Sequence, residues 1–304
     1  KDYAQTRHNM GFNVINKLAK QYEAEAFSSD ALRKELYGSE AVQEHNEKVF
    51  DILTRRMIET LKAGKSVVFD AMNISSKNRR HTLRILGKYV DKKIAYLLVT
   101  PFEMCLERNN SRERHVPEEV IKRAYMNFTV PCVQEGFDEV NLIYPDGFNA
   151  REYIVKKYDE CDIPHDNRHH VYGVLEHMFK AGRYYVDTCR PENYDKVLMF
   201  STFLHDIGKP FCKTFVNYKG EKTEDAHYYG HEHVGAYLSL FYTELSPKDR
   251  IESALMIQYH MNYYTSWNKS EKAKQRDKDF LGSELFEKIE KLHECDIEAH
   301  HYDF

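Results

Sequence analysis

The first half of the chain alternates between short apolar runs and longer amphipathic stretches. The short runs predict strands, and they lie at 24–28, 66–69, 94–99 and 140–144. The amphipathic stretches between them predict helices, which begin near 30, 42, 76, 102 and 117. Short, nearly all-apolar strands that alternate with helices are typical of a parallel sheet covered on both faces. We therefore expect an α/β domain over residues 1–150.

The pattern becomes helical in the second half. Residues 145–166 contain Pro145, Gly147 and Pro164, which predicts a linker. From His170 onward the spacing of apolar residues is helical, apart from a hairpin-like stretch at 213–222. We therefore expect an all-α domain over residues 165–304.

Composition narrows the class of protein. Hydrophobic residues make up 42% of the 304 residues and charged residues 30%, as in an ordinary soluble protein. No apolar run approaches the roughly eighteen residues of a membrane span, and the net charge of −4 neither requires nor excludes a nucleic-acid partner. The six cysteines form no CxxC pair, so we expect reduced thiols in a cytoplasmic protein that binds no membrane.

Histidine is unevenly distributed. Twelve of the sixteen histidines lie between His165 and His301, which is less than half of the chain. Surface histidines would scatter evenly, so this bias favours metal or acid–base chemistry in the second half.

The strongest local signal lies at the end of an apolar helix predicted over 197–204. The sequence there reads FLHDIGKP, with Gly208 expected to stop the helix and Pro210 beyond it. The neighbouring predicted helices each supply one more candidate ligand to the pair in this motif. The full candidate set is His177, His205, Asp206, His231, His260 and Asp296.

Imidazole and carboxylate side chains suit a divalent cation, and helical bundles hold such ions between inward-facing residues. A ligand set of two His and two Asp leaves positions for a metal-bound water, which ionises near neutral pH and attacks phosphorus. Lys209 would add a positive charge next to the phosphoryl oxygens. Any one of these histidines alone would more often be an ordinary hydrogen-bonded residue, but their order on successive helices favours a metal site.

These residues resemble the H…HD…D ligand set of HD-superfamily phosphohydrolases. The phrases GHEHVGA and QYHM are also similar to those of HD domains attached to tRNA CCA-adding enzymes, and the resemblance covers about 165–304. It implies that one metal, which could be manganese, nickel, cobalt, magnesium or iron, is held by His177, His205, Asp206 and Asp296. It also implies that His231 and His260 either bind a second metal or face the substrate phosphate.

The first half offers polar residues at the ends of predicted strands. Asp30 opens a helix and could accept a proton from a hydroxyl, while Arg33 could hold a phosphate, although a Ser-Ser-Asp run is more often a plain helix cap. Asp70 ends a buried strand, where ligand sites of parallel sheets form. A possible arginine lid over phosphates, equally compatible with a solvated helix end, contains Arg108, Arg112 and Arg114.

The phrases SSDALRKELYG and VFDAMNIS resemble P-loop kinases of the polynucleotide kinase type, over about 17–145. The resemblance implies that Asp30 activates a 5′-hydroxyl and that Arg33 contacts a nucleic-acid phosphate. It also implies that Arg112, with Arg108 or Arg114, contacts a nucleotide, with ATP and Mg²⁺ as cofactors of a functional kinase.

The phosphate loop of that family, GxxxxGK[ST], occurs nowhere in this chain. Residues 1–22 instead resemble the start of bacterial peptidyl-tRNA hydrolases, in which His8 matches the catalytic histidine. We interpret this stretch as a replaced N-terminus, and we expect no transfer of phosphate from ATP by the chain as it stands.

The sequence therefore predicts an α/β P-loop-kinase-like domain followed by an all-α HD domain. The expected activity is metal-dependent hydrolysis of a phosphate ester, and the expected substrates are RNA or DNA ends or nucleotides. Two alternatives remain, namely a non-catalytic nucleic-acid-binding protein and a peptidyl-tRNA hydrolase.

Overall fold

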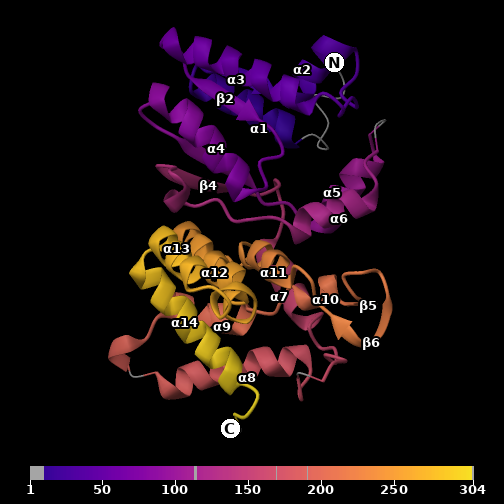
Figure 1. Cartoon of the computed structure of the whole chain (residues 1–304), viewed down its shortest axis with the longest axis vertical. Helices are drawn as coiled ribbons and strands as arrows, with labels where there is room; N and C mark the ends of the chain where they lie inside the picture. Colours follow the sequence, from indigo (N-terminus) through magenta and orange to yellow (C-terminus); the bar gives the residue numbers. More distant parts are fainter. Residues whose placement is uncertain (1–9, 113–114, 169, 190, 303–304) are drawn as a thin grey trace.

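The computed structural model describes residues 10–112, 115–168, 170–189 and 191–302. An α/β part formed by the first half of the chain lies at one end of the molecule, and a helix-rich part lies at the other (Figure 1). None of the helices in the described ranges is long and apolar enough to cross a membrane.

The α/β part alternates helices and strands as the sequence predicted. Its main elements, in chain order, are α1 Met10–Gln21, β1 Glu25–Ser28, α2 Ser29–Tyr37, α3 Asn46–Lys62, β2 Val67–Asp70, α4 Ser76–Leu86, β3 Ile94–Leu98, α5 Phe102–Asn110, α6 Glu118–Met126 and β4 Glu139–Ile143.

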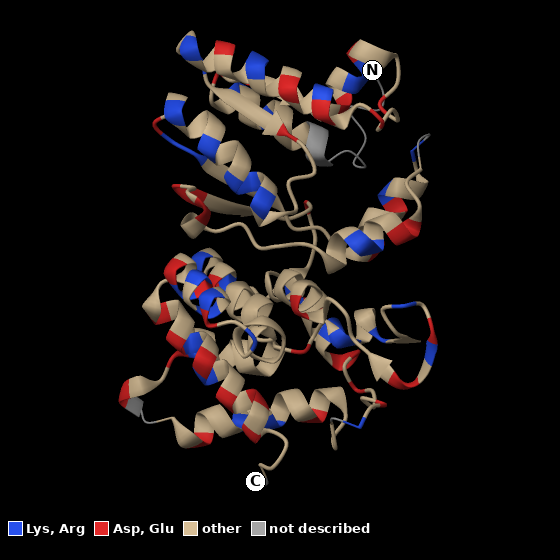
Figure 2. Cartoon of the chain, in the orientation of Figure 1, with Lys and Arg blue, Asp and Glu red and all other residues tan. Residues whose placement is uncertain are grey.

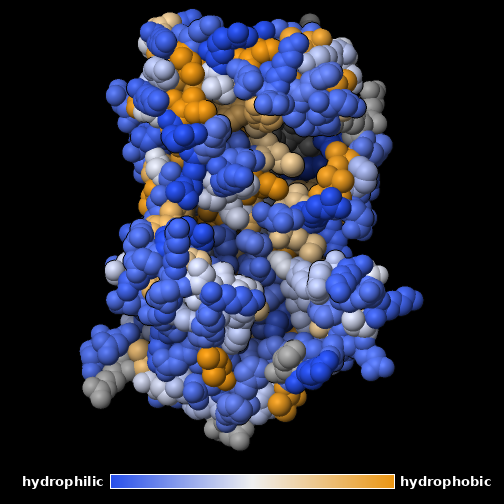
Figure 3. Space-filling view, in the orientation of Figure 1, coloured by the Kyte–Doolittle hydropathy of each residue, from blue (hydrophilic) through white to orange (hydrophobic). Residues whose placement is uncertain are grey.

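The strands form two separate parallel pairs, so the expectation of one continuous sheet is wrong. β1 pairs with β2 and β3 pairs with β4, and no described strand joins β2 to β3. Every residue of β2 and β3 is consequently only half-buried, although nearly all of them are apolar. Figure 3 shows hydrophobic residues in a hollow on the face of the α/β part that is turned toward the viewer.

A small core holds the first pair of strands to its helices. One face of α3 buries Val49, Leu53 and Met57, which follow a helical repeat of four residues. They pack against Phe27 of β1 and Leu32 of α2. Full burial of each such side chain contributes about 1.5–3 kcal/mol, which makes this cluster the main support of β1 and β2.

The stretch predicted as a linker contains a packed helix, α7 Ala150–Asp159, which corrects that interpretation. The side chain of Asn149 accepts a hydrogen bond from the Glu152 amide and so caps the helix. Ile154 is buried, and the ring of Tyr153 lies 4.7 Å from that of Phe241. Proline and glycine at the edges of the stretch had suggested a loop, but the apolar residues inside it pack onto the second half.

The second half is mainly helical. Its main elements are α8 Val174–Thr188, α9 Lys196–Leu204, α10 Lys209–Cys212, β5 Thr214–Val216, β6 Lys222–His227, α11 His231–Ser239, α12 Pro247–Tyr259, α13 Glu271–Leu281 and α14 Ser283–Glu298. β5 and β6 are antiparallel, as the hairpin prediction required.

The two halves share one core. Val99 and Phe128 from the first half belong to the same buried cluster as the residues of α11 and α12. The hydroxyl of Tyr237 accepts a hydrogen bond from the Thr100 amide at 2.8 Å, and the Val130 amide donates to Gln258 Oε1 at 2.7 Å. These buried contacts tie the α/β part to the helical part.

A buried ion pair in the α/β part leads to a stability prediction. Arg79 of α4 donates two hydrogen bonds to Glu135, at 2.7 and 2.5 Å, and neither side chain is more than 5% exposed. Glu135→Ala leaves a buried guanidinium without its carboxylate, so we expect it to lower the free energy of unfolding by about 3 kcal/mol or more. Chemical denaturation measures this change.

The double variant Arg79→Met/Glu135→Leu is the matched control. It removes both charges at similar volume, so it should recover most of the lost stability. A Glu135→Ala protein as stable as the wild type would contradict the prediction.

Candidate metal centre

The six predicted ligands meet in the middle of the helical half. His177 lies in α8, and His205 and Asp206 follow α9 directly. The other three are His231 at the start of α11, His260 at the end of α12 and Asp296 in α14. Each of the six is at most 5% exposed, so five elements turn these polar side chains inward.

Glycines allow these elements to approach closely. A Cβ on Gly208 would lie 2.2 Å from the carbonyl oxygen of His231, and one on Gly182 would lie 2.5 Å from the ring of Phe203. Gly208 has ordinary helical dihedrals and precedes α10, so it does not act as the helix stop that the sequence suggested. Its role is to let the turn after α9 pack directly on α11.

Two histidines and two carboxylates form the first group of facing atoms. His177 Nε2 lies 2.8 Å from Asp296 Oδ1 and 3.4 Å from His205 Nε2. His205 Nε2 lies 3.3 Å from Asp206 Oδ2 and 3.4 Å from Asp296 Oδ1. These separations are close to those between the ligands of one transition metal, since each ligand lies about 2.0–2.2 Å from the ion.

A second group lies on the other side of Asp206. Its Oδ1 is 3.2 Å from His231 Nε2 and 3.7 Å from His260 Nε2, whereas its Oδ2 faces His205. The two oxygens of one carboxylate therefore face two different sets of histidines.

Backbone carbonyls determine which nitrogen of three of these rings carries a proton. The Nδ1 atoms of His205, His231 and His260 lie 2.6–2.8 Å from the carbonyl oxygens of Thr202, Tyr228 and Ile257. A carbonyl only accepts hydrogen bonds, so each Nδ1 is the donor, and a neutral ring then presents an Nε2 lone pair to the carboxylates. Histidines that bind a metal through one ring nitrogen typically donate the other ring N–H to such a carbonyl oxygen.

The donor set fits a cation. Within the described part of the chain, the buried Nε2 atoms of His231 and His260 have no hydrogen-bond partner. Lone pairs that face carboxylate oxygens repel each other, and a divalent ion between them would turn this repulsion into coordination. The residues present are therefore able to hold a metal.

The carboxylates of this centre are ionised. Burial alone would raise the pKa of Asp206 and of Asp296, but neighbouring groups hold both pKa values well below the usual range. Lys209 is the main such neighbour for Asp206, and His177 and His205 are those of Asp296. Burial would likewise lower the pKa of His205, yet Asp206 and Asp296 raise it to about 10. Without a metal, a proton on His205 thus partly balances the two negative charges, and a bound cation would displace it.

Lys209 lies at the edge of the centre with its three N–H groups directed at protein atoms. Its Nζ is 2.6 Å from Asp206 Oδ2, 3.0 Å from His165 Nε2 and 3.3 Å from His170 Nε2. An ammonium has three donors. In this geometry Lys209 keeps no N–H for a substrate, so the predicted direct contact with phosphoryl oxygens would need it to move.

Sequence reasoning missed the side chains around Lys209. His165, His170 and His300 lie beside His177, and Tyr264 donates a hydrogen bond to Asp296 Oδ2 at 3.1 Å. The excess of histidines in this half was the only sequence signal for them.

In the α/β part, Asp30 and Asp70 lie near the carboxyl ends of β1 and β2. Ser28 of β1 is the register partner of Asp70. Burial raises the pKa of Asp70, with a smaller contribution from the charge of Asp30, while a hydrogen bond from Ser28 opposes the rise. Arg33 is buried and donates to Asp30 at 2.7 Å and to Asn46 at 2.6 Å.

The predicted arginine lid is only partly described. Arg108 lies in α5 and is half-buried. Arg112 donates to Asn109 Oδ1 at 2.9 Å, and Arg114 lies outside the described residues. The phosphate-binding roles of these arginines, and that of Arg33, stay predictions.

Comparison with known families bears on the α/β part. Residues 13–131 match a family model described as an AAA domain, and the match ends before the helical half. It supports a kinase-like N-terminal domain, for which ATP and Mg²⁺ are the typical cofactors.

Proposed function

We propose that this protein is a metal-dependent phosphohydrolase of the HD type, which acts on a phosphate ester of an RNA or DNA end or of a nucleotide. The observation that carries the proposal is the buried convergence of imidazole nitrogens and ionised carboxylates around Asp206. Buried charges of this kind are normally paired or coordinate a metal.

We further propose two neighbouring cation sites that share Asp206. His177, His205, Asp206 and Asp296 would hold the first cation, and Asp206, His231 and His260 would hold the second. The division of the two Asp206 oxygens between the two histidine groups favours this arrangement over a single site. A bound divalent metal supplies an activated water near neutral pH and offsets the phosphoryl charge.

The residues of the chain orient this centre. Hydrogen bonds from Nδ1 to backbone carbonyls hold the rings of His205, His231 and His260, so their Nε2 atoms stay directed inward. Tyr264 fixes one oxygen of Asp296 by hydrogen bonding, which leaves the other directed at His177. Burial of the ligands excludes bulk water from the ligand side.

The kinase-like part would bind the nucleic acid in this scheme. Basic residues lie along α4, as Figure 2 shows, and they include Lys77, Arg80 and Arg84. Such a row supports contacts to phosphates and is also the observation that favours the alternative of a non-catalytic nucleic-acid-binding protein. The alternative of a peptidyl-tRNA hydrolase depends on His8, which lies outside the described residues.

Metal removal tests the proposed activity. Purified protein should release inorganic phosphate from an oligonucleotide with a 3′-phosphate, and chelation with EDTA followed by desalting should reduce the rate to the buffer background. Added Mn²⁺ or Ni²⁺ should restore it, since the metal generates the attacking water. Phosphate release that persists in metal-free protein would rule out this mechanism.

A further inference from the structure

We infer that His170 is a catalytic residue of this site, which donates its Nδ1–H to a phosphoryl oxygen of the substrate. The inference rests on the proposed function and adds to it a specific anion contact. It assigns to Lys209 and His165 the role of positioning residues that act through His170.

The position of His170 separates it from the ligands. Its ring lies parallel to that of His165, with a 3.8 Å separation between centroids and 7° between planes. The six ligand side chains are buried, whereas His170 and the neighbouring His300 are half-buried. His170 therefore lies where the buried centre meets the solvent, which is the side from which a phosphate ester can enter.

The contact with Lys209 shows which ring nitrogen of His170 carries the proton. Lys209 Nζ lies 3.3 Å from His170 Nε2. An ammonium only donates, so Nε2 must be the acceptor, and the proton of the neutral ring is on Nδ1. This Nδ1 is buried, and it has no hydrogen-bond partner in the part of the chain that the structure describes.

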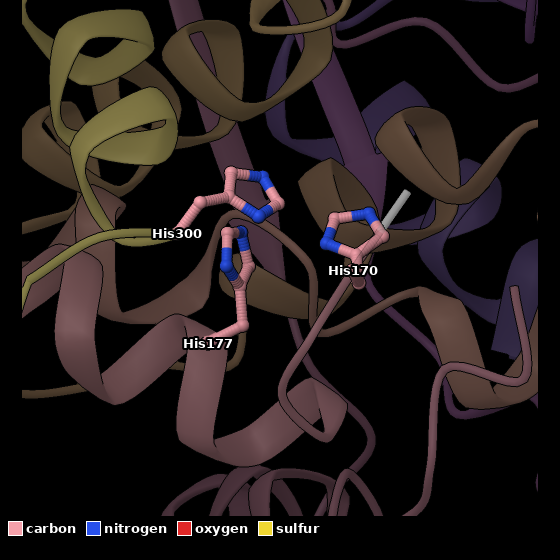
Figure 4. A group of neighbouring side chains, drawn as sticks. All are labelled: His170, His177 and His300. Atoms are coloured by element: carbon pink, nitrogen blue, oxygen red, sulfur yellow. The ribbon is translucent and has the colours of Figure 1, made fainter. Parts of the chain in front are cut away.

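The unpartnered Nδ1–H faces the ligand His177. One nitrogen each of His170, His177 and His300 lies within 4.8 Å of the other two. In Figure 4 the nitrogen of His170 next to its point of attachment is the one turned toward these two rings. A metal–ligand bond and a hydrogen bond in series span about 5 Å, so an oxygen bound beside His177 would lie within reach of this donor.

The same proton argues against His170 as a third metal ligand in this group. Coordination through Nδ1 requires a lone pair there and a proton on Nε2. That proton would point at the ammonium of Lys209, replacing an attractive contact by a repulsive one. An N–H donor that meets an anion keeps every contact of the present arrangement.

The remaining contacts show how the positive charge of Lys209 can reach the substrate. Lys209 already donates hydrogen bonds to Asp206, His165 and His170. His165 in turn donates from Nδ1 to the carbonyl oxygen of Tyr172 at 2.6 Å. The ammonium polarises the His170 ring, which strengthens its Nδ1–H as a donor. A fixed N–H aimed at developing negative charge is the arrangement that stabilises a phosphoryl transition state.

Two substitutions of His170 separate the donor from the ring. His170→Phe keeps the stacking on His165 and removes the N–H, while His170→Asn places an amide N–H near the position of Nδ1. His301→Phe, at an exposed neighbouring histidine, is the matched control. For each protein we would measure the metal content, the rate of phosphate release from a 3′-phosphorylated oligonucleotide, and inhibition by inorganic phosphate.

We expect His170→Phe to keep its metal, to lose about a hundredfold in turnover, and to be inhibited by phosphate about tenfold more weakly. His170→Asn should recover part of both losses, and His301→Phe should match the wild type. Loss of metal from folded His170→Phe would show that His170 is a ligand, which overturns the inference. So would unchanged turnover and unchanged phosphate inhibition.

The wild-type arm separates this inference from the proposed function. If the wild-type protein holds metal and hydrolyses the substrate while His170→Phe behaves identically, only the role of His170 is wrong. If the wild type itself neither holds metal nor hydrolyses, the proposed function is wrong. If His170→Phe fails to fold, as seen by its thermal melt, His170→Ala serves as the variant without the donor and His170→Asn stays the variant with one. Full turnover and full phosphate affinity in folded His170→Ala would then refute the inference.

Discussion

The double variant His205→Ala/Asp206→Ala is expected to purify without the divalent metal that we expect the wild-type protein to carry. The substitution removes one nitrogen of the first group and the only carboxylate shared by both groups. Both candidate sites lose ligand atoms in this variant, so the ligands that remain at each site are too few to hold an ion strongly. Elemental analysis of protein purified without a histidine tag measures the metal content per chain.

The control is His81→Ala, which removes an exposed histidine of α4, far along the chain from the centre. It should retain the metal content of the wild type. Equal metal in the double variant and the wild type would mean that the ion binds elsewhere or that the preparation carries it nonspecifically.

The Asp296→Ala variant is expected to lose phosphate release by about two orders of magnitude or more, because loss of a ligand impairs water activation. Asp296 Oδ1 is the atom nearest to His177 Nε2 in the centre, at 2.8 Å, and it also faces His205. Steady-state release of phosphate from a 3′-phosphorylated oligonucleotide, with saturating Mn²⁺, measures the loss.

Tyr264→Phe is an informative companion, because it removes only the hydrogen bond to Asp296 Oδ2 and keeps the carboxylate. It should cost about tenfold in activity, less than Asp296→Ala, because residues that hydrogen-bond to metal ligands typically contribute about ten- to a hundredfold. Full activity in Asp296→Ala would place the reaction at another site.

The six side chains that meet in the centre could be singled out from the sequence because each signal is local. FLHDIGKP joins an apolar helix to adjacent His and Asp residues, and His177 and Asp296 each lie in a neighbouring predicted helix. The hairpin and most helices follow from the same local periodicity. The match over 13–131 likewise agrees with the kinase-like interpretation of the α/β part.

Only the tertiary structure decided the features that depend on contacts between distant segments of the chain. Local apolar runs cannot say which strands pair, so the division of β1–β2 from β3–β4 was not foreseen. Nor could they show that α7 packs on α11 and joins the two halves.

The chemistry of the centre was decided in the same way. His177 and Asp296 are 119 residues apart, and Lys209 and His165 are 44 apart. The sequence determined which residues could act as ligands, because residue type and helical spacing are properties of one segment. Only packing decided which nitrogen of each ring faces the carboxylates and where the protons of Lys209 go, because a hydrogen bond depends on the position of both partners.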